Sequence, residues 1–256
     1  MNDIDFGLTA DDYARYRAGF PDSLFERLRA WGIGQSGQKL VDLGTGTGTL
    51  ARGFASRGCK VIGIDPSTEL VAQAKALDKA TGVAVEYRQA TAEETGLPAD
   101  SFDVVSAGQC WHWFERSRAA REVARILKPD AYIVIVHFDW LPLPGNILDL
   151  TENLIYVYNP AWRGGGGNGL HPAWLTDLGK AAYREIETFS YDVAVPYTHE
   201  AWRGRIRASA GVGASLPPEK VAAFDREFKT LLQENYPEDV LSVPHRVFAV
   251  IAKSPV

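Results

Sequence analysis

The clearest chemical feature of the sequence is a glycine-rich segment, residues 41–48 (VDLGTGTG), which continues a short apolar run. Asp42 supplies a carboxylate before the turn, while Gly44 and Gly46 let the backbone bend tightly and approach a ligand without a Cβ in the way. A helix that begins directly after such a turn directs its free N–H groups at the ligand. This pattern predicts a binding site for a nucleotide-like cofactor.

Two phosphate-binding patterns do not fit this segment. The dinucleotide fingerprint requires Gly or Ala three residues after its second glycine, and Thr49 stands there. The nucleoside triphosphate loop requires a Gly-Lys-Ser/Thr ending, which the segment lacks. A carboxylate at Asp42 would also repel a pyrophosphate and attract a cationic ligand.

A second carboxylate, Asp65, ends the next apolar run and lies 21 positions after Gly44 (65 minus 44). In nucleotide-binding sheets, an acidic residue at the end of the second strand accepts hydrogen bonds from the ribose hydroxyls. A carboxylate at this point can equally cap the helix that Pro66 and Ser67 open. The residues alone leave both interpretations open.

Short apolar runs alternate with amphipathic stretches, which predicts a mostly parallel sheet with helices on both faces. Strands are expected at residues 39–43, 60–65, 83–87, 102–106, 132–136, 184–195 and 246–252. Residues 139–182 break the alternation and contain a glycine run, and residues 199–236 are expected to be mostly helical. The expected fold is therefore a doubly wound α/β sheet with helical C-terminal insertions that form a substrate cap.

Residues 41–48 resemble motif I of the class I S-adenosylmethionine-dependent methyltransferases. Four further segments resemble the UbiE-like and trans-aconitate methyltransferase branch, in the correct order: residues 13–21 (YARYRAGFP), 90–93 (ATAE), 106–114 (SAGQCWHWF) and 127–129 (LKP). Ala18 and Asp130-Ala131 depart from the proline and the glycine pair usual in that branch. The resemblance implies a seven-stranded Rossmann-like sheet in the order 3-2-1-4-5-7-6, with the last strand antiparallel.

The resemblance also implies S-adenosyl-L-methionine as cofactor and S-adenosyl-L-homocysteine as product. In the family, the N-terminal segment closes over the methionine end of the cofactor, motif I holds its centre, and the segment after the third strand borders the adenine. The implied cofactor-binding residues are Tyr13, Arg17, Asp42, Gly44, Thr45, Gly46, Asp65, Pro66, Thr91, Ala92, Glu93 and Gln109.

His112 is the candidate catalytic base, because the segment after the fourth strand faces the methyl group in this fold and imidazole titrates near neutral pH. A packing histidine between Trp111 and Trp113 is the alternative. The candidate substrate-binding residues are Trp111, Trp113, Trp202 and Arg203. Aromatic residues are often simply core, and Arg203 with Arg207 is often a solvated helix face, so these alternatives stay open.

Composition narrows the class of protein. With 27 basic and 32 acidic side chains the net charge is -5, which disfavours nucleic acid as a partner. Two cysteines indicate a cytoplasmic setting without disulfides, no apolar run is long enough to span a membrane, and the five histidines lack the paired spacing of a metal site. The expected partner is a small-molecule substrate, and the expected state is a monomer or homodimer.

One domain over residues 1–256 is expected: an N-terminal lid and helix (1–35), a cofactor-binding core (36–138), cap insertions with the remaining strands (139–245) and a last strand (246–256). The predicted function is methyl transfer from S-adenosylmethionine to a small-molecule acceptor, with O- or N-methylation favoured. Two alternatives stay open: a cyclase or isomerase that keeps the cofactor without using its methyl group, and a regulatory cofactor-binding module.

Overall fold

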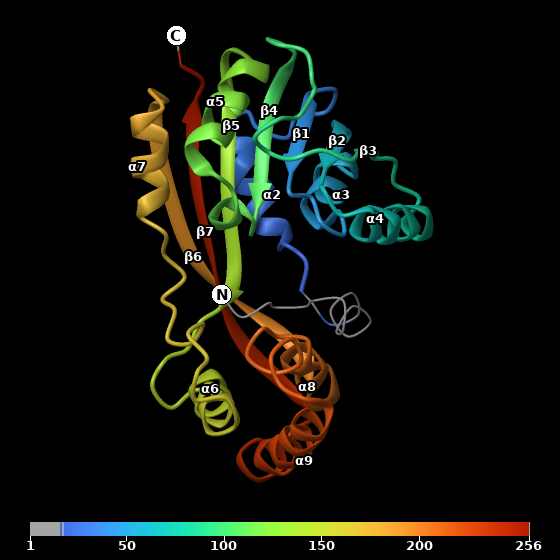
Figure 1. Cartoon of the computed structure of the whole chain (residues 1–256), viewed down its shortest axis with the longest axis vertical. Helices are drawn as coiled ribbons and strands as arrows, with labels where there is room; N and C mark the ends of the chain where they lie inside the picture. Colours follow the sequence, from blue (N-terminus) through green and yellow to red (C-terminus); the bar gives the residue numbers. More distant parts are fainter. Residues whose placement is uncertain (1–15, 17, 256) are drawn as a thin grey trace. The chain divides into compact units, whose positions relative to one another are not determined.

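The computed structural model describes residue 16 and residues 18–255, and its strands form one seven-stranded sheet in the order β3-β2-β1-β4-β5-β7-β6 (Figure 1). This is the predicted strand order. The strands are β1 (Lys39–Leu43), β2 (Lys60–Ile64), β3 (Glu86–Arg88), β4 (Phe102–Gly108), β5 (Leu127–Trp140), β6 (Arg184–Thr198) and β7 (Val240–Lys253).

The central strands are parallel, as predicted. β1 pairs in parallel with β2 and β4, β2 with β3, and β4 with β5. Leu43, the last residue of β1, lies opposite Ile64 of β2 and Ala107 of β4. The carboxyl ends of these three strands therefore meet at one edge of the sheet, which is where ligands bind in open α/β sheets.

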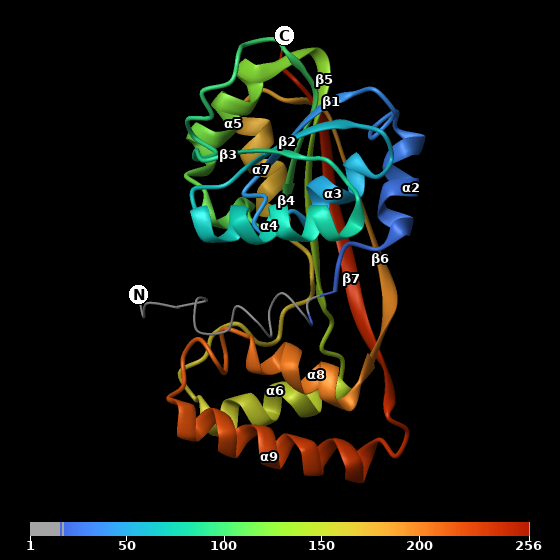
Figure 2. The same cartoon turned by 90° about the vertical axis from the view of Figure 1, so that its right-hand side faces the viewer.

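Helices cover both faces of the sheet. Figure 2 shows α5 and α7 on one face and α2 on the other. The described helices are α2 (Asp22–Ala30), α3 (Thr49–Ala55), α4 (Thr68–Thr81), η2 (Trp111–Trp113), α5 (Arg116–Ile126), α6 (Ile147–Tyr158), α7 (Ala173–Lys180), α8 (His199–Arg207) and α9 (Pro218–Asn235). In the part of the chain that the structure describes, no helix combines the length and the apolar character needed to cross a membrane.

Six of the seven predicted strands have different bounds, and β3, β5 and β7 start at other residues than predicted: Glu86, Leu127 and Val240. β3 begins at Glu86 rather than Val83, because α4 ends on a left-handed cap at Gly82 and the N–H of Val83 still bonds to the carbonyl of Asp78. β5 begins at Leu127 and includes Pro129. The register between β4 and β5 shifts between Phe102 and Val104, and this irregularity accommodates the proline.

The chain forms two compact units. The sheet unit comprises residues 19–138, 170–191 and 247–255, and the helical unit comprises residues 139–169 and 192–246 with Tyr16 and Ala18. Trp202, Phe224 and Phe228, all completely buried, belong to the core on which α6, α8 and α9 of the helical unit pack. The sequence predicted cap insertions together with the remaining strands over residues 139–245, and within that range residues 170–191, which contain α7 and the start of β6, pack with the sheet unit.

A buried ion pair connects the elements around the glycine-rich segment. Arg52 on α3 lies 2.8 Å from the Asp78 carboxylate on α4, and it also donates a 2.8 Å hydrogen bond to the carbonyl of Thr47. Tyr87 on β3 packs against Gly48, and burial together with the nearby Asp78 raises the pKa of its hydroxyl. These side chains hold α3, α4 and β3 against residues 47–48 of the glycine-rich segment.

Replacing Asp78 with Asn should destabilise the fold by about 3 kcal/mol, because Arg52 would remain largely buried without its counter-charge. The free energy of unfolding in urea measures this cost. Glu86→Gln is the matched control, since it removes one partner of the exposed Arg88–Glu86 pair and should cost less than about 1 kcal/mol. Equal costs for the two variants would show that the buried pair is not a structural support.

Candidate cofactor site

The glycine turn has one closed side and one open side. Gly44 and Gly46 have φ angles of +57° and +56°, the left-handed region that favours glycine. A Cβ on Gly44 would lie 2.8 Å from the Cβ of Cys110, whereas a Cβ on Gly46 would have no atom within 4 Å. The turn therefore packs against Cys110 at Gly44 and leaves space for a ligand at Gly46.

Asp65 connects this turn to the start of α4. One carboxylate oxygen accepts a 2.9 Å hydrogen bond from the N–H of Gly46, and the other accepts a 2.9 Å bond from the N–H of Ser67. Ser67 is itself the N-cap of α4. The helix cap is the Ser67 hydroxyl, which accepts from the N–H of Leu70, so Asp65 holds the capping residue rather than capping α4 itself. Each carboxylate oxygen of Asp65 keeps a lone pair for a further donor such as a ribose hydroxyl.

Asp42 lies beneath the turn and is 1% exposed. Its carboxylate accepts 2.7 Å hydrogen bonds from the hydroxyls of Thr45 and Ser106. Burial raises the pKa of Asp42 from 3.8 to about 6, although these two hydrogen bonds lower it in part. A nearby cation would favour the ionised form, so the site is suited to a positively charged ligand.

The segment predicted to border the adenine follows β3 and turns back on itself. Thr91 is exposed and forms a bridge with Glu94, while Ala92 is buried in the sheet-unit core. Glu93 accepts a 2.8 Å hydrogen bond from the backbone N–H of Glu115, and Pro66 is exposed at the end of β2. Their role as cofactor contacts stays a prediction.

Gln109 follows the last residue of β4 with a φ of +58°, an uncommon conformation for a residue with a side chain. Its backbone N–H donates to Val136, and its side-chain amide donates to the carbonyl of Phe138, both on β5. Backbone strain of this kind concentrates at functional sites. The positive φ of Gln109 turns the chain at the carboxyl end of β4, where η2 follows.

His112 and its two tryptophan neighbours occupy different environments. His112 is exposed, and Trp113 is 66% exposed with its ring centroid 4.8 Å from the imidazole. Trp111 is completely buried and donates a 3.2 Å hydrogen bond to Asp177. The location of Trp111 favours the core interpretation, whereas His112 and Trp113 can be reached by a ligand.

The other two predicted substrate-binding residues belong to the helical unit. Trp202 is completely buried and donates to the hydroxyl of Thr151. Arg203 bonds to the carboxylates of Asp225 and Glu200, so an anionic substrate would have to compete with both. The alternative of a solvated helix face does not describe Arg203, whose side chain is 13% exposed. Substrate binding by Trp202 and Arg203 stays a prediction.

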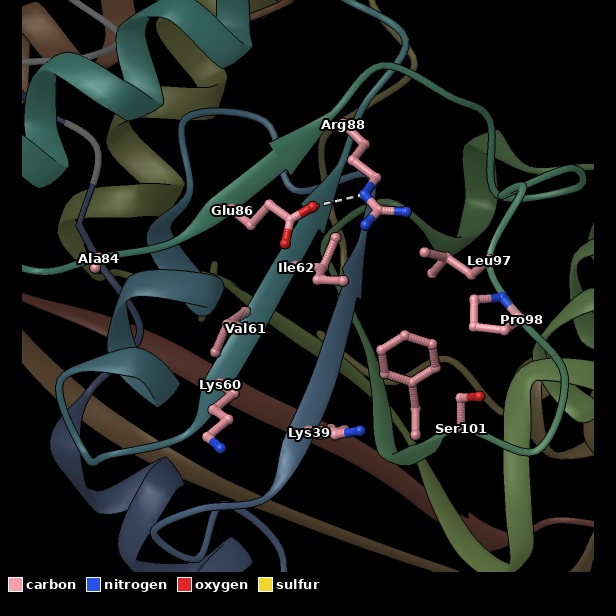
Figure 3. Close-up of a pocket in the computed structure, with 11 residues that line it drawn as sticks. Lys39, Lys60, Val61, Ile62, Ala84, Glu86, Arg88, Leu97, Pro98 and Ser101 are labelled. Atoms are coloured by element: carbon pink, nitrogen blue, oxygen red, sulfur yellow. Dashed lines mark hydrogen bonds and ion pairs between the residues drawn. The ribbon is translucent and has the colours of Figure 1, made fainter.

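The N-terminal contacts Tyr13 and Arg17 lie outside the described residues, and their role stays a prediction. A hollow of about 440 Å³ lies elsewhere on the sheet unit (Figure 3). Lys39 and Lys60, the first residues of β1 and β2, contribute to its lining. It therefore reaches the amino ends of the strands, opposite the edge that carries the glycine turn.

Sequence reasoning missed several residues of this region. Ser106 bonds to Asp42, and Arg52 supports the turn from α3. His137 lies beside His112, and His171 lies beside His137. Each comes from a different segment of the chain. Of the four, only Ser106 lies within a segment whose resemblance had already been recognised.

Comparison with known proteins identifies the central part of the chain. A family model described as a methyltransferase domain matches residues 41–135. These residues are a methyltransferase domain. The match begins in the strand before the glycine turn and ends in β5, so it covers the turn, Asp65 and His112. The resemblance to class I methyltransferases is thereby confirmed.

An uncharacterised methyltransferase of Mycobacterium tuberculosis is 32% identical over 133 residues, which are 52% of this chain and 51% of that protein. The chain thus spans about half the length of the curated relatives it matches.

Two solved structures extend the fold comparison to nearly the whole chain. A putative type II methyltransferase from Anaeromyxobacter dehalogenans matches 94% of this chain and 98% of its own, with a TM-score of 0.67 and 21% identity. A Haemonchus contortus phosphoethanolamine N-methyltransferase, in complex with phosphomonomethylethanolamine and S-adenosylhomocysteine, matches all of this chain and 58% of its own, with a TM-score of 0.58 and 20% identity. At these identities the matches show the methyltransferase fold.

The methyltransferase domain has residues that fit S-adenosylmethionine. The open space over Gly46 is a place where a Cβ, and therefore a ligand atom, meets nothing. Asp65, which bonds to the N–H of Gly46, can accept further hydrogen bonds from a ligand. Asp42, beneath the glycine turn, favours a positively charged ligand. When bound, this cofactor supplies an electrophilic methyl group on a sulfonium.

A matched pair of glycine variants distinguishes an effect on fold stability from an effect on cofactor binding. Gly44→Ala and Gly46→Ala impose the same backbone strain, about 1–2 kcal/mol each, because the φ angles are equal within a degree. Gly44→Ala also pushes the new Cβ against Cys110. The free energy of unfolding, measured by heat or urea, should therefore fall by about a further 1 kcal/mol or more. Gly46→Ala should instead weaken S-adenosylhomocysteine binding about tenfold or more in calorimetry. The reverse ranking would contradict this geometry.

Cofactor affinity should depend on the protonation of Asp42. The folded-state pKa of about 6 lies above the unfolded value of 3.8, so the carboxyl is still protonated at pH 5 and must lose its proton to favour a cation. Affinity for S-adenosylmethionine should therefore rise about tenfold from pH 5 to pH 7.5 and then level off. Calorimetry with Asp42→Asn is the control, and it should show little of this dependence. An equally steep dependence in the variant would assign it to another group.

Proposed function

We propose that this protein transfers a methyl group from S-adenosylmethionine to an oxygen or nitrogen atom of a small-molecule acceptor. The observation that carries the proposal is the glycine turn at the carboxyl edge of the sheet, open over Gly46 and flanked by Asp65. The family match over residues 41–135 and the bound S-adenosylhomocysteine in the similar N-methyltransferase support the choice of cofactor.

His112 is the proposed base. Methyl transfer is an in-line displacement that depends mainly on alignment of the acceptor lone pair with the methyl carbon. A hydroxyl or protonated amine must also lose a proton, and an exposed imidazole beside the carboxyl end of β4 can accept it. Trp113, exposed and in ring contact with His112, is a suitable apolar wall for the acceptor.

The test uses S-adenosylmethionine with a labelled methyl group and matched panels of phenols, amines and carboxylic acids. We expect labelled product and S-adenosylhomocysteine with at least one phenol or amine. His112→Gln should then lower turnover by a factor of about 100 or more and leave cofactor affinity nearly unchanged. The cofactor measurement controls for damage to the turn.

Other outcomes are equally informative. Cofactor binding without transfer to any of these acceptors would favour the cyclase or the regulatory module over the methyltransferase. Labelled carboxylate esters with full activity in His112→Gln would remove His112 from the catalytic list, because a carboxylate is already ionised at neutral pH and needs no base. Tight binding of NAD instead of S-adenosylmethionine would overturn the cofactor assignment.

A further inference from the structure

The hollow on the sheet unit lies where the chain crosses from β3 to β4 without a helix. Residues 89–101, all of which the structure describes, contain turns and an isolated bridge but no helix. Parallel strands are usually joined by a helix that covers the sheet face beside them. Here a loop takes that place, and its residues Leu97, Pro98 and Ser101 line the hollow of about 440 Å³.

Apolar side chains form the middle of the hollow. Lys60 and Ile62 lie two positions apart on β2, so their side chains share one face of the sheet. Leu97 and Phe102 belong to the core of the sheet unit, and Ile62 packs against that core while staying half-buried. The hollow therefore offers a ligand an apolar wall.

Two lysines lie side by side at one end of the hollow. Lys39 and Lys60 are register partners on β1 and β2, and both are exposed. Figure 3 shows both side chains at this end, while Arg88 lies at the other. Neighbouring strands are about 4.8 Å apart, so the two like charges repel each other. An anion bound between the two ammonium groups would offset this repulsion.

The acidic side chain closest to this end has a cation of its own. Asp103 forms an ion pair with Lys128 at 2.6 Å and accepts a 2.8 Å hydrogen bond from the backbone N–H of Lys39. The charges of Lys39 and Lys128 both act on this carboxylate. Within the part of the chain that the structure describes, the Lys60 ammonium has no carboxylate at ion-pair distance. This end of the hollow therefore carries an excess of positive charge.

The other end of the hollow is balanced in charge. Arg88 lies 2.7 Å from the carboxylate of Glu86, and both side chains are about half exposed. The hydroxyl of Ser101 donates to the carbonyl of Ala99. A ligand that matches the whole hollow thus has an anionic group at one end and an apolar body. The volume of about 440 Å³ lies within the range of small-molecule sites.

We propose that this hollow is a second ligand site, for an organic anion that joins an apolar body to a carboxylate or phosphate group. The anionic group lies between Lys39 and Lys60, and the apolar body lies on Ile62 and Leu97. Lys39 begins β1 and the glycine turn follows the last residue of that strand, about 13 Å further along. The site is therefore separate from the cofactor site, and the inference does not depend on the proposed function.

Calorimetry with naphthoate and naphthyl phosphate tests the proposal, and naphthalenemethanol, which has the same rings without the charge, is the matched control ligand. At low salt at least one of the anions should bind about tenfold more tightly than the alcohol. An increase in salt from about 20 to about 200 mM should weaken binding of the anion and leave that of the alcohol nearly unchanged. The proposal is wrong if neither anion binds, or if the alcohol binds equally well.

Exchanging single lysines tests the position of the anionic group. Lys60→Gln and Lys39→Gln should each lower the affinity for the anion about fivefold, because each removes one ammonium group. Lys75→Gln on α4 is the matched control, since Lys75 is exposed and does not line the hollow, and it should leave the affinity unchanged. An equal loss in all three variants would indicate a general effect of charge and would overturn the site.

S-adenosylhomocysteine distinguishes this site from the cofactor site. A saturating amount of it should not displace the anion, and Lys60→Gln should leave its own affinity unchanged. In NMR of the labelled protein, the anion should shift the methyl signals of Ile62 and not the backbone N–H signal of Gly46. Displacement of the anion, or an unchanged Ile62 signal, would contradict the proposal. If the anion shifts Ile62 but no methyl transfer is found, the second site stands and the proposed function fails.

Discussion

The site depends on one steric constraint: at Gly44, in the turn after β1, and at Gly63, on β2, the backbone lies so close to its neighbours that a Cβ would not fit. A Cβ at Gly44 would meet Cys110 at 2.8 Å, and one at Gly63 on β2 would meet Tyr87 at 2.8 Å. Glycine at these positions lets β1, β2 and the segment after β4 approach closely. The same close approach brings Asp65 within hydrogen-bonding distance of Gly46.

This close packing also buries charge, and the structure balances that charge locally. Asp42 is covered by the turn and keeps two hydroxyl donors, yet burial still raises its pKa to about 6. Arg52 and Asp78 neutralise each other on the other side of the turn. The Asp42 carboxylate is thus available to favour a cation, while the Asp78 carboxylate supports the fold through Arg52.

The course of the central sheet could be predicted from the sequence because its strands are short, apolar and locally periodic. β1 has the predicted bounds, and the strand order follows from the family resemblance. The start of β3 and the length of β5 could not be predicted, since they depend on a helix cap at Gly82 and on a register shift beside β4. Both are contacts between segments rather than properties of one segment.

The sequence by itself determined the glycine turn, the two carboxylates Asp42 and Asp65, and the segment that carries His112, because each is a short motif with a fixed local spacing. Tertiary structure was needed to show that Arg203 is held by Asp225, that His137 adjoins His112 and that His171 adjoins His137. The physical reason is that a motif records how a backbone bends locally. Contacts among side chains 22 or more residues apart (225 minus 203) arise only when strands and helices from separate segments pack together.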